Sequence, residues 1–384
     1  MSARAAVVVL DACGVGALPD AAAYGDEGAN TLGHLAEAAG GLDLPVLGGL
    51  GLGSILPLPG VPPAPEPAVH GRLHPLGPGK DSTTGHWELM GVVAPAPLPT
   101  YPDGFPPEVL ARVRELTGRG VLGNQALNGL EAIERYGEEH LRTGELIVYT
   151  SVDSVLQVAA HVDVVAPEEL YAGCRAVRGA MTGEHAVGRI IARPFRGQPG
   201  AFERTEGRHD FSVSPPGRSY LEELSEAGVP VHGVGKVEDL FAGVGVAESH
   251  PGATNAAAID SIDALLGRLE EGLVFANLVE TDQLYGHRKD VEGFHAALRE
   301  IDAAAGRWLD ALGPDDLLVL TADHGCDITR AGSDHTREHA PLLATFPGHA
   351  GRRHDGTFAD VGASVLRWLT GRDAPALPGR PFLD

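Results

Sequence analysis

The sequence predicts an α/β protein whose core is a doubly wound, mostly parallel sheet with a smaller inserted α+β domain. Three short apolar runs, at 5–10, 273–279 and 316–322, have the length and residue types of strands buried in a parallel sheet. Helical patterns at 255–272 and 291–313 lie before and between the last two runs, with apolar residues three and four positions apart. Alternating strands and helices of this kind are typical of a doubly wound sheet.

Irregular segments indicate where the smaller domain is inserted. We interpret the proline-rich stretch 56–67 as a surface excursion of the core, 95–107 as a hinge, and 193–217 as a matching irregular connection. A chain of 384 residues is also longer than most single domains. The predicted domains are a core at 1–98 and 218–384 and an inserted cap at 99–217.

The inserted segment has strand and helix patterns of its own. LIVYTSV at 146–152 and GRIIARPF at 188–195 are predicted to be strands, and EELYAGCRAVRGAM at 168–181 is predicted to be a helix. We therefore expect the cap to have an α+β architecture.

The charge of the chain disfavours several classes of partner. Lys and Arg number 29 against 52 Asp and Glu, which gives a net charge of −23. Such a charge repels nucleic acid and anionic membranes, so we expect a small-molecule partner and neither nucleic acid nor membrane. An anionic substrate would need bound cations or a few basic side chains to reverse the local potential.

The cysteines and the apolar segments indicate a cytoplasmic protein. Cys13, Cys174 and Cys326 are odd in number and widely spaced, which argues against a disulfide framework and for a reducing compartment. The apolar run near the N-terminus is shorter than the core of a signal peptide, and no apolar stretch is long enough to span a membrane.

Acids and histidines follow the predicted strands and suggest a metal centre. The candidate ligands are Asp11, Asp282, His287, Asp323, His324 and His335. Taken alone, each of these residues has an alternative to a ligand role, because an Asp after a strand is often a helix cap and a single His is often structural. Together they form a mixed oxygen and nitrogen set that suits Mn, Zn or Fe better than Ca. Two divalent ions about 4 Å apart would need roughly this many ligands.

The segment DSTTGHWE at 81–88 offers three adjacent hydroxyl groups as nucleophiles. If a helix begins near Asp81, its free N–H groups and its dipole stabilise a phosphate on the first turn, which favours Ser82. A nearby divalent ion would lower the pKa of that hydroxyl. Thr83 and Thr84 remain alternatives, as polar turn residues or as hydroxyls that contact phosphate.

Seven segments together resemble bacterial phosphopentomutases, which belong to the alkaline phosphatase superfamily. They are LDACGVGALPDA, GKDSTTGHWE, YTSVDSVLQVAAH, GRIIARPF, LVETDQLYGHRKD, TADHGCD and GSDHTREHAPLLA. TADHG and the Asp and His spacing are shared across the superfamily, whereas the GKD, SVDSVLQ and DHTREH segments are more specific to the mutase. The resemblance covers essentially the whole chain and implies an alkaline phosphatase-like core with a cap.

The resemblance implies two Mn²⁺ ions and a phosphorylated hydroxyl. Asp11, Asp323 and His324 would hold one ion together with the nucleophile, and Asp282, His287 and His335 would hold the other. The phosphorylated residue of the family falls on Ser82, where the family usually has threonine. This change removes a methyl group but keeps the hydroxyl.

The same resemblance implies residues that bind the substrate. Asp153 matches a position near the substrate, and Arg189, Arg204 and Lys236 match positions that approach its distal phosphate. The alternative for the two arginines is a solvated surface charge. Cys326 is expected to be a buried thiol rather than a ligand, and Glu280 is given no metal role.

The implied activity is the reversible interconversion of ribose 1-phosphate and ribose 5-phosphate, and of the 2-deoxy sugars. It would run through a phosphoserine enzyme and a 1,5-bisphosphate, and a sugar bisphosphate would prime it. The alternatives are a cofactor-independent phosphoglycerate mutase, a phosphatase or sulfatase of the superfamily, and a binding module without activity. The sequence predicts neither the oligomeric state nor the preferred pentose.

Overall fold

The computed structural model describes residues 3–151, 153–349 and 351–383. The chain divides into two compact units, Met1–Pro97 with Pro215–Asp384 and Leu98–Ser214. We call these the core unit and the cap unit. The cap is a continuous segment between the two parts of the core sequence, and the sequence places this insertion at 99–217.

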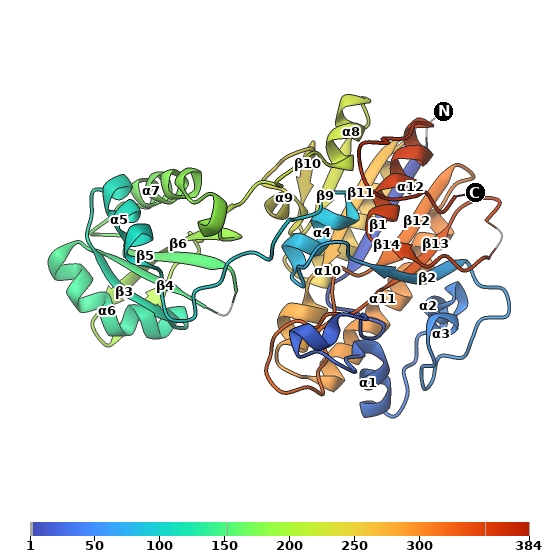
Figure 1. Cartoon of the computed structure of the whole chain (residues 1–384), viewed down its shortest axis with the longest axis horizontal. Coiled ribbons are helices and arrows are strands. Elements are labelled where there is room, and N and C mark those ends of the chain that lie inside the picture. The colour runs from blue at the N-terminus through green and yellow to red at the C-terminus, as the bar shows by residue number, and fades with distance from the viewer. Residues whose placement is uncertain (1–2, 152, 350, 384) are drawn as a thin grey trace. The chain divides into compact units, whose positions relative to one another are not determined.

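The core unit contains an eight-stranded sheet in the order β10-β9-β11-β1-β12-β13-β2-β14 (Figure 1). Its strands are β1 (Arg4–Leu10), β2 (Val69–His74), β9 (Val231–Val234), β10 (Glu248–His250), β11 (Gly272–Leu278), β12 (Asp316–Thr321), β13 (Ala340–Thr345) and β14 (Gly356–Thr357). The five strands from β10 to β12 are parallel, and β13 runs antiparallel to both of its neighbours, β12 and β2.

Strand β1 lies inside the parallel part of the sheet, and its apolar side chains are buried. It pairs in parallel with β11 on one side and with β12 on the other. Residues 5–10 are all buried. The three apolar runs singled out in the sequence are therefore three adjacent strands, which confirms the predicted fold class.

Helices cover both faces of the core sheet (Figure 1). The helices are α1 (Thr31–Ala38), α2 (Pro45–Leu50), α3 (Leu52–Ile55), α4 (Ser82–Leu89), α8 (Tyr220–Glu226), α9 (Val237–Leu240), α10 (Asn255–Arg268), α11 (Val291–Ala311) and α12 (Ala359–Thr370), with the 3₁₀ helix η1 (Ala21–Tyr24) and the π-helical turn η3 (Thr281–Gly286). Helices α4, α8, α9 and α12 pack together on one face, and α10, α11, α1, α2 and α3 pack on the other.

The carboxyl ends of the parallel strands meet at one edge of the sheet. β1 ends directly before Asp11, β11 leads into η3, and β12 ends two residues before Asp323. In doubly wound sheets this edge carries the binding crevice, so the fold gathers these segments where chemistry is expected.

The cap unit contains a six-stranded mixed sheet between two layers of helices. Its strands are β3 (Val121–Ala126), β4 (Leu146–Thr150), β5 (Val155–His161), β6 (Arg189–Gln198), β7 (Ala201–Arg204) and β8 (His209–Ser212), and its helices are α5 (Pro107–Thr117), α6 (Gly129–Thr143), α7 (Pro167–Ala180) and η2 (Gly183–His185). Alternate residues of β4 face different cores: Leu146 and Val148 pack with α5 and α7, whereas Ile147 and Tyr149 pack with α6.

The strand expected at 146–152 is shorter in the structure. β4 ends at Thr150, and residue 152 lies outside the described residues.

The expectation of an irregular segment at 193–217 is wrong. This segment holds the end of β6 and all of β7 and β8. Gln198 pairs with Ala201, so Pro199 and Gly200 form a two-residue hairpin turn with Gly200 at a φ of 82°. The prolines and glycines that suggest a loop are therefore the residues of a turn between paired strands.

Within the described ranges, no helix is long and apolar enough to cross a membrane. Cys13, Cys174 and Cys326 are buried free thiols.

Candidate active site

Three carboxylates meet where three adjacent strands of the core sheet end. Asp11, Asp282 and Asp323 follow β1, β11 and β12 and are all buried. Burying three like charges together is unfavourable unless positive charge compensates them. Imidazoles lie beside these carboxylates, in groups of potential ligands that share members.

The first group consists of Asp11, Asp323 and His324. Each offers one ligand atom, and these atoms lie within 4.8 Å of one another. His324 Nε2 lies 3.3 Å from Asp11 Oδ1 and 3.5 Å from Asp323 Oδ2. The other ring nitrogen, Nδ1, donates to the carbonyl of Gly325 at 3.1 Å, which directs Nε2 toward the carboxylates. The structure thus brings together the three residues expected to share one ion.

The second group surrounds Asp282. His287 Nε2 lies 3.3 Å from its Oδ2, and His335 Nε2 lies 3.4 Å from its Oδ1. The π-helical turn places Asp282 and His287 side by side, because the His287 amide donates to the Asp282 carbonyl five residues earlier. His287 Nδ1 also donates to the carbonyl of Ser333 at 2.6 Å.

The grouping around Asp282 differs in one respect from the expected trio. The atoms that lie within 4.8 Å of one another are those of Asp282 with His324 and His335, and those of Asp282 with His287 and Cys326. Asp282 is therefore shared by two overlapping sets. His324 belongs to both the first and the second group, so the two groups form one continuous cluster.

Ser82 is the hydroxyl of the 82–84 run that faces this cluster. Its Oγ lies 3.0 Å from His324 Nε2 and donates to Asp11 Oδ1 at 3.5 Å. Ser82 is the first residue of α4, and the carboxylate of Asp81 caps this helix by accepting from the Thr84 amide at 3.1 Å.

The neighbouring hydroxyls have other surroundings. The Thr84 hydroxyl is buried and donates to Asp81 Oδ2 at 2.7 Å, so it completes the helix cap. Thr83 is half-buried. Of the three hydroxyls, that of Ser82 has hydrogen-bonding contacts with candidate ligands.

Two carboxylates of the cluster, those of Asp282 and Asp323, are held in their ionised form. Burial raises the pKa of Asp282, but the imidazoles of His287 and His335 overcome this effect and hold the pKa well below its usual range. Burial also raises the pKa of Asp323, yet the His324 imidazole and its neighbours bring it down to about 2.

Two imidazoles, those of His287 and His324, show the reciprocal effect. The Asp282 carboxylate raises the pKa of His287 to about 11. Burial lowers the pKa of His324, but the charges of Asp323 and Asp11 raise it well above its usual range. The site therefore attracts positive charge, either as protons on the imidazoles or as cations.

Several buried atoms in the cluster fit a metal centre better than a hydrogen-bond network. Asp282 Oδ1, Asp323 Oδ2 and His335 Nε2 are buried and lack hydrogen-bond partners within the described residues. Orphaned polar atoms of this kind are costly in a protein interior. Carboxylate and imidazole donors that converge without hydrogen-bond geometry are what a divalent transition metal ion requires.

Two buried residues that the sequence reasoning did not single out support the site. His86 Nδ1 lies 2.8 Å from the Ser82 carbonyl and 3.1 Å from Asp323 Oδ2, and Asn277 donates to Asp11 Oδ2 at 3.0 Å. His86 lies one helical turn after Ser82, and Asn277 is a polar residue within an otherwise apolar strand. Both features are visible in the sequence and could have pointed to the site.

Two residues given no ligand role lie in the site or next to it in the chain. The Cys326 thiol lies in one group with Asp282 and His287. Glu280 accepts from the Asn255 amide at 2.8 Å and thus braces the start of η3 against α10.

The expected substrate-binding residues are divided between the two units. Lys236 is half-buried in the core unit, two residues after β9, on the carboxyl side of that strand. Asp153, Arg189 and Arg204 belong to the cap unit. Arg189 Nη2 lies 4.0 Å from Asp153 Oδ2, and Arg189 Nη1 lies 3.5 Å from Asp210 Oδ2.

Arg204 lies beside the hydroxyl of Tyr149 in the cap unit. A Cβ atom placed on Gly129 would lie 2.2 Å from Arg204 Nη2 and 2.6 Å from Tyr149 Oη, so both side chains pack over this glycine. The Tyr149 hydroxyl is buried and lacks a hydrogen-bond partner among the described residues. Arg193, which donates to Gln157 at 2.6 Å, adds a third polar group that the sequence reasoning missed.

Comparison with known proteins identifies the family. The metalloenzyme superfamily profile matches residues 3–371. The phosphopentomutase of Anaeromyxobacter dehalogenans strain 2CP-1 is 54% identical over 373 residues, covering 96% of each chain. The phosphopentomutase of Caldanaerobacter subterraneus subsp. tengcongensis is 48% identical over 370 residues, covering 95% of this chain and 94% of that one.

Solved structures support the fold. A phosphoglycerate mutase from Leishmania mexicana aligns with a TM-score of 0.51 at 14% identity, covering 99% of this chain and 97% of that chain. A Pyrococcus horikoshii protein aligns with the same TM-score at 15% identity, covering 97% and 98%. At these identities the likeness concerns the fold alone. The sequence identities and their coverage carry the assignment, and the chain belongs to the phosphopentomutase family within the metalloenzyme superfamily.

Proposed function

We propose that the protein interconverts ribose 1-phosphate and ribose 5-phosphate, and the corresponding 2-deoxyribose phosphates, through phosphorylation of Ser82. The observation that carries this proposal is the position of the Ser82 hydroxyl, 3.0 Å from His324 Nε2 and 3.5 Å from Asp11 Oδ1. The family membership supports the substrate class.

We assign the two candidate groups to two divalent ions, with Mn²⁺ as the expected metal. Asp11, Asp323 and His324 would hold one ion, and Asp282, His287 and His335 would hold the other. When bound, such ions lower the pKa of a hydroxyl and neutralise charge on a phosphoryl group. The low carboxylate pKa values and the orphaned buried atoms support this assignment.

The chemistry requires two transfers of the same kind. In the first, the C1 hydroxyl of ribose 5-phosphate attacks the phosphorus of phosphorylated Ser82, and the bond to Ser82 Oγ breaks. This step gives ribose 1,5-bisphosphate and a free serine. The bisphosphate then presents its 5-phosphate, Ser82 Oγ attacks it, and ribose 1-phosphate leaves. The proton lost by the C1 hydroxyl is balanced by the proton gained at the C5 oxygen.

Positioning and charge neutralisation are the tasks of the remaining residues. Ser82 lies at the first turn of α4, where free backbone N–H groups stabilise an added phosphate. We assign Arg189, Arg204 and Lys236 to the distal phosphate, since arginine binds phosphate through two parallel hydrogen bonds. Asp153 is assigned to the sugar.

Two further expectations accompany the proposal. A sugar bisphosphate would prime the enzyme, because the free serine must be phosphorylated before the first turnover. The three free thiols support a reducing compartment, and we place the reaction in the cytoplasm.

The proposal is tested by comparing three activities of the purified protein with Mn²⁺ and a trace of ribose 1,5-bisphosphate. We expect interconversion of the pentose phosphates to exceed both isomerisation of phosphoglycerate and release of inorganic phosphate. The Ser82→Ala variant measures the background. Faster conversion of phosphoglycerate, or phosphate release that outpaces pentose isomerisation, would replace the proposed reaction by a phosphoglycerate mutase or a phosphatase reaction.

A further inference from the structure

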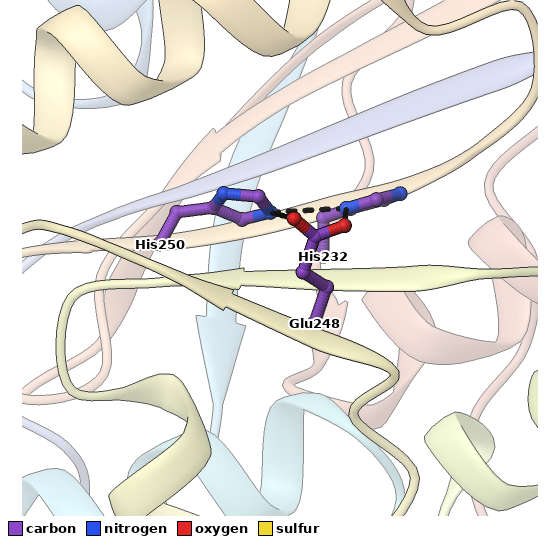
Figure 2. Close-up of side chains that lie close together, drawn as sticks. All are labelled: His232, Glu248 and His250. Atoms are coloured by element: carbon purple, nitrogen blue, oxygen red, sulfur yellow. Dashed lines mark hydrogen bonds and ion pairs between the residues drawn. The ribbon is translucent and has the colours of Figure 1, made fainter.

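Three potential metal ligands lie together at the edge of the core sheet, and none of them belongs to the active-site cluster. His232 is in β9, and Glu248 and His250 are in the edge strand β10. Figure 2 shows the three side chains pointing toward one another. They form a group whose ligand atoms lie within 4.8 Å of one another.

The pairing of the strands explains why these side chains meet. β9 and β10 are parallel, with Glu248 opposite His232. Glu248 and His250 are two residues apart, so their side chains leave β10 on the same face. The three residues are therefore placed by regular strand geometry and not by a loop.

The distances between the ligand atoms match those around a small cation. His232 Nδ1 lies 3.0 Å from His250 Nε2 and 3.5 Å from Glu248 Oε2, and His250 Nε2 lies 3.8 Å from Glu248 Oε1. Tetrahedral Zn²⁺, with bonds of about 2.0–2.2 Å, holds its ligand atoms roughly 3.3–3.6 Å apart. Only small rotations of the side chains would bring all three atoms to that spacing.

We propose that His232, Glu248 and His250 form a separate site for a divalent transition metal ion such as Zn²⁺, which fastens the edge strand β10 to β9. Two imidazoles and one carboxylate are a ligand set that Zn²⁺ uses when a fourth position is left for water. His232 is buried and Glu248 is exposed, so the ion is reached from the solvent side.

The same side chains have a competing arrangement without metal. The two imidazoles then share a hydrogen bond, and Glu248 Oε1 lies 3.9 Å from the exposed guanidinium of Arg268. Binding the ion displaces the proton between the two rings and draws Glu248 away from Arg268. These two arrangements differ in the number of metal ions that the protein retains, which can be measured.

The position of the site suggests what the ion stabilises. β10 has only three residues and lies at the edge of the sheet, so it has few backbone hydrogen bonds to hold it. The chain continues from β10 to Asn255, which exchanges two hydrogen bonds with Glu280, its amide donating at 2.8 Å and its Oδ1 accepting at 3.1 Å. The ion thus fastens a segment that leads to the start of η3.

The experiment counts zinc ions per chain. The protein is equilibrated with Zn²⁺ alone, dialysed, and analysed by atomic spectroscopy. We compare the wild type with His250→Gln, Glu248→Gln and the control His295→Gln, which removes a half-buried histidine of α11 outside the metal-ligand groups. We expect the first two variants to retain one ion fewer than the wild type and the control.

Equal zinc content in all four proteins would overturn the proposal. Circular dichroism shows whether each variant folds. If His250→Gln fails to fold, the zinc content of Glu248→Gln tests the proposal alone, because Glu248 is exposed. Crystals of the dialysed wild type give a second reading: the zinc anomalous signal is expected between His232 Nδ1 and His250 Nε2. A map with zinc only at the active-site cluster would equally overturn the proposal.

Discussion

The hydroxyl oxygen of Ser82 lies 3.0 Å from Nε2 of His324. This contact links the first turn of α4 to the segment after β12, and it places one hydroxyl of three within the candidate metal cluster. Because His324 Nδ1 already donates to Gly325, the atom that faces Ser82 is the one available to bind a cation.

Replacing Ser82 tests the role of its hydroxyl. We expect Ser82→Ala to lower kcat for pentose phosphate interconversion by about 10³-fold or more, since it removes the nucleophile. Ser82→Thr keeps a hydroxyl at the same position and is expected to keep kcat within about tenfold of the wild type. Thr83→Ala serves as the control. Full activity of Ser82→Ala would exclude this serine as the nucleophile.

Replacing Asp282 tests the metal cluster. Asp282→Asn removes the carboxylate charge that faces His287 and His335 at 3.3 and 3.4 Å. We expect a loss of bound metal and a fall in kcat/KM greater than the roughly 100-fold that outer-shell changes cost. Chelation should abolish the activity of the wild type. Added Mn²⁺ should restore the activity of the wild type, but it should not raise the activity of the variant. The exposed Asp260→Asn is the matched control, and equal metal content in both variants would contradict the assignment.

The close approach of α4 to the segment after β12 can be tested at a glycine. A Cβ atom on Gly85 would lie 2.3 Å from the backbone oxygen of Asp323, so an alanine there must push α4 away. We expect Gly85→Ala to lower the free energy of unfolding by about 1–3 kcal/mol and to reduce activity, because Ser82 moves with the helix.

The control for Gly85 is another helical glycine. A Cβ atom on the exposed Gly267 of α10 meets no atom within 4 Å, so Gly267→Ala should raise the unfolding free energy by up to about 1 kcal/mol. Urea unfolding followed by tryptophan fluorescence checks both variants, since all three tryptophans lie in the core unit. Equal effects of the two substitutions would show that α4 has room to adjust.

The cap unit should lose stability as the pH falls through the histidine range. His140 is buried, its Nδ1 donates to the Glu145 carbonyl at 2.6 Å, and its Nε2 accepts from the His161 amide at 2.8 Å. Burial lowers the pKa of His140. The folded state therefore prefers the neutral ring, and its stabilising contribution is present above about pH 6.5 and lost as the pH falls below that value.

Hydrogen exchange measures this effect. At pH 7.5 we expect amides of β5 to exchange more slowly in the wild type than in His140→Leu, and at pH 5.5 we expect the difference to shrink. Comparing the two proteins at one pH removes the intrinsic pH dependence of exchange. The exposed His209→Gln is the control. A difference that grows toward low pH would contradict the prediction.

The core fold could be predicted because its central strands are buried on both faces and therefore appear as continuous apolar runs. The hairpin of β7 could not, because Gly197, Pro199 and Gly200 resemble loop residues and only pairing with β6 makes this segment a strand. The π-helical turn η3 was also beyond prediction, since its six residues carry no distinct sequence period.

The residues that meet at the candidate site could be predicted from the sequence, but their exact grouping could not. The carboxyl ends of adjacent parallel strands meet, so the convergence of Asp11, Asp282 and Asp323 follows from strand order. The sharing of Asp282 between two groups depends on side-chain directions that no spacing encodes. The pairing of Glu248 with His232 likewise depends on strand register. The metal and substrate roles of these residues stay predictions.

Mass spectrometry of the phosphorylated protein tests the central claim most directly. The wild type is incubated with Mn²⁺ and ribose 1,5-bisphosphate and digested, and the added phosphate is mapped within residues 81–88. We predict a single phosphate on Ser82. Phosphate on Thr83 or Thr84, or an active enzyme that never carries phosphate in this segment, would contradict the account.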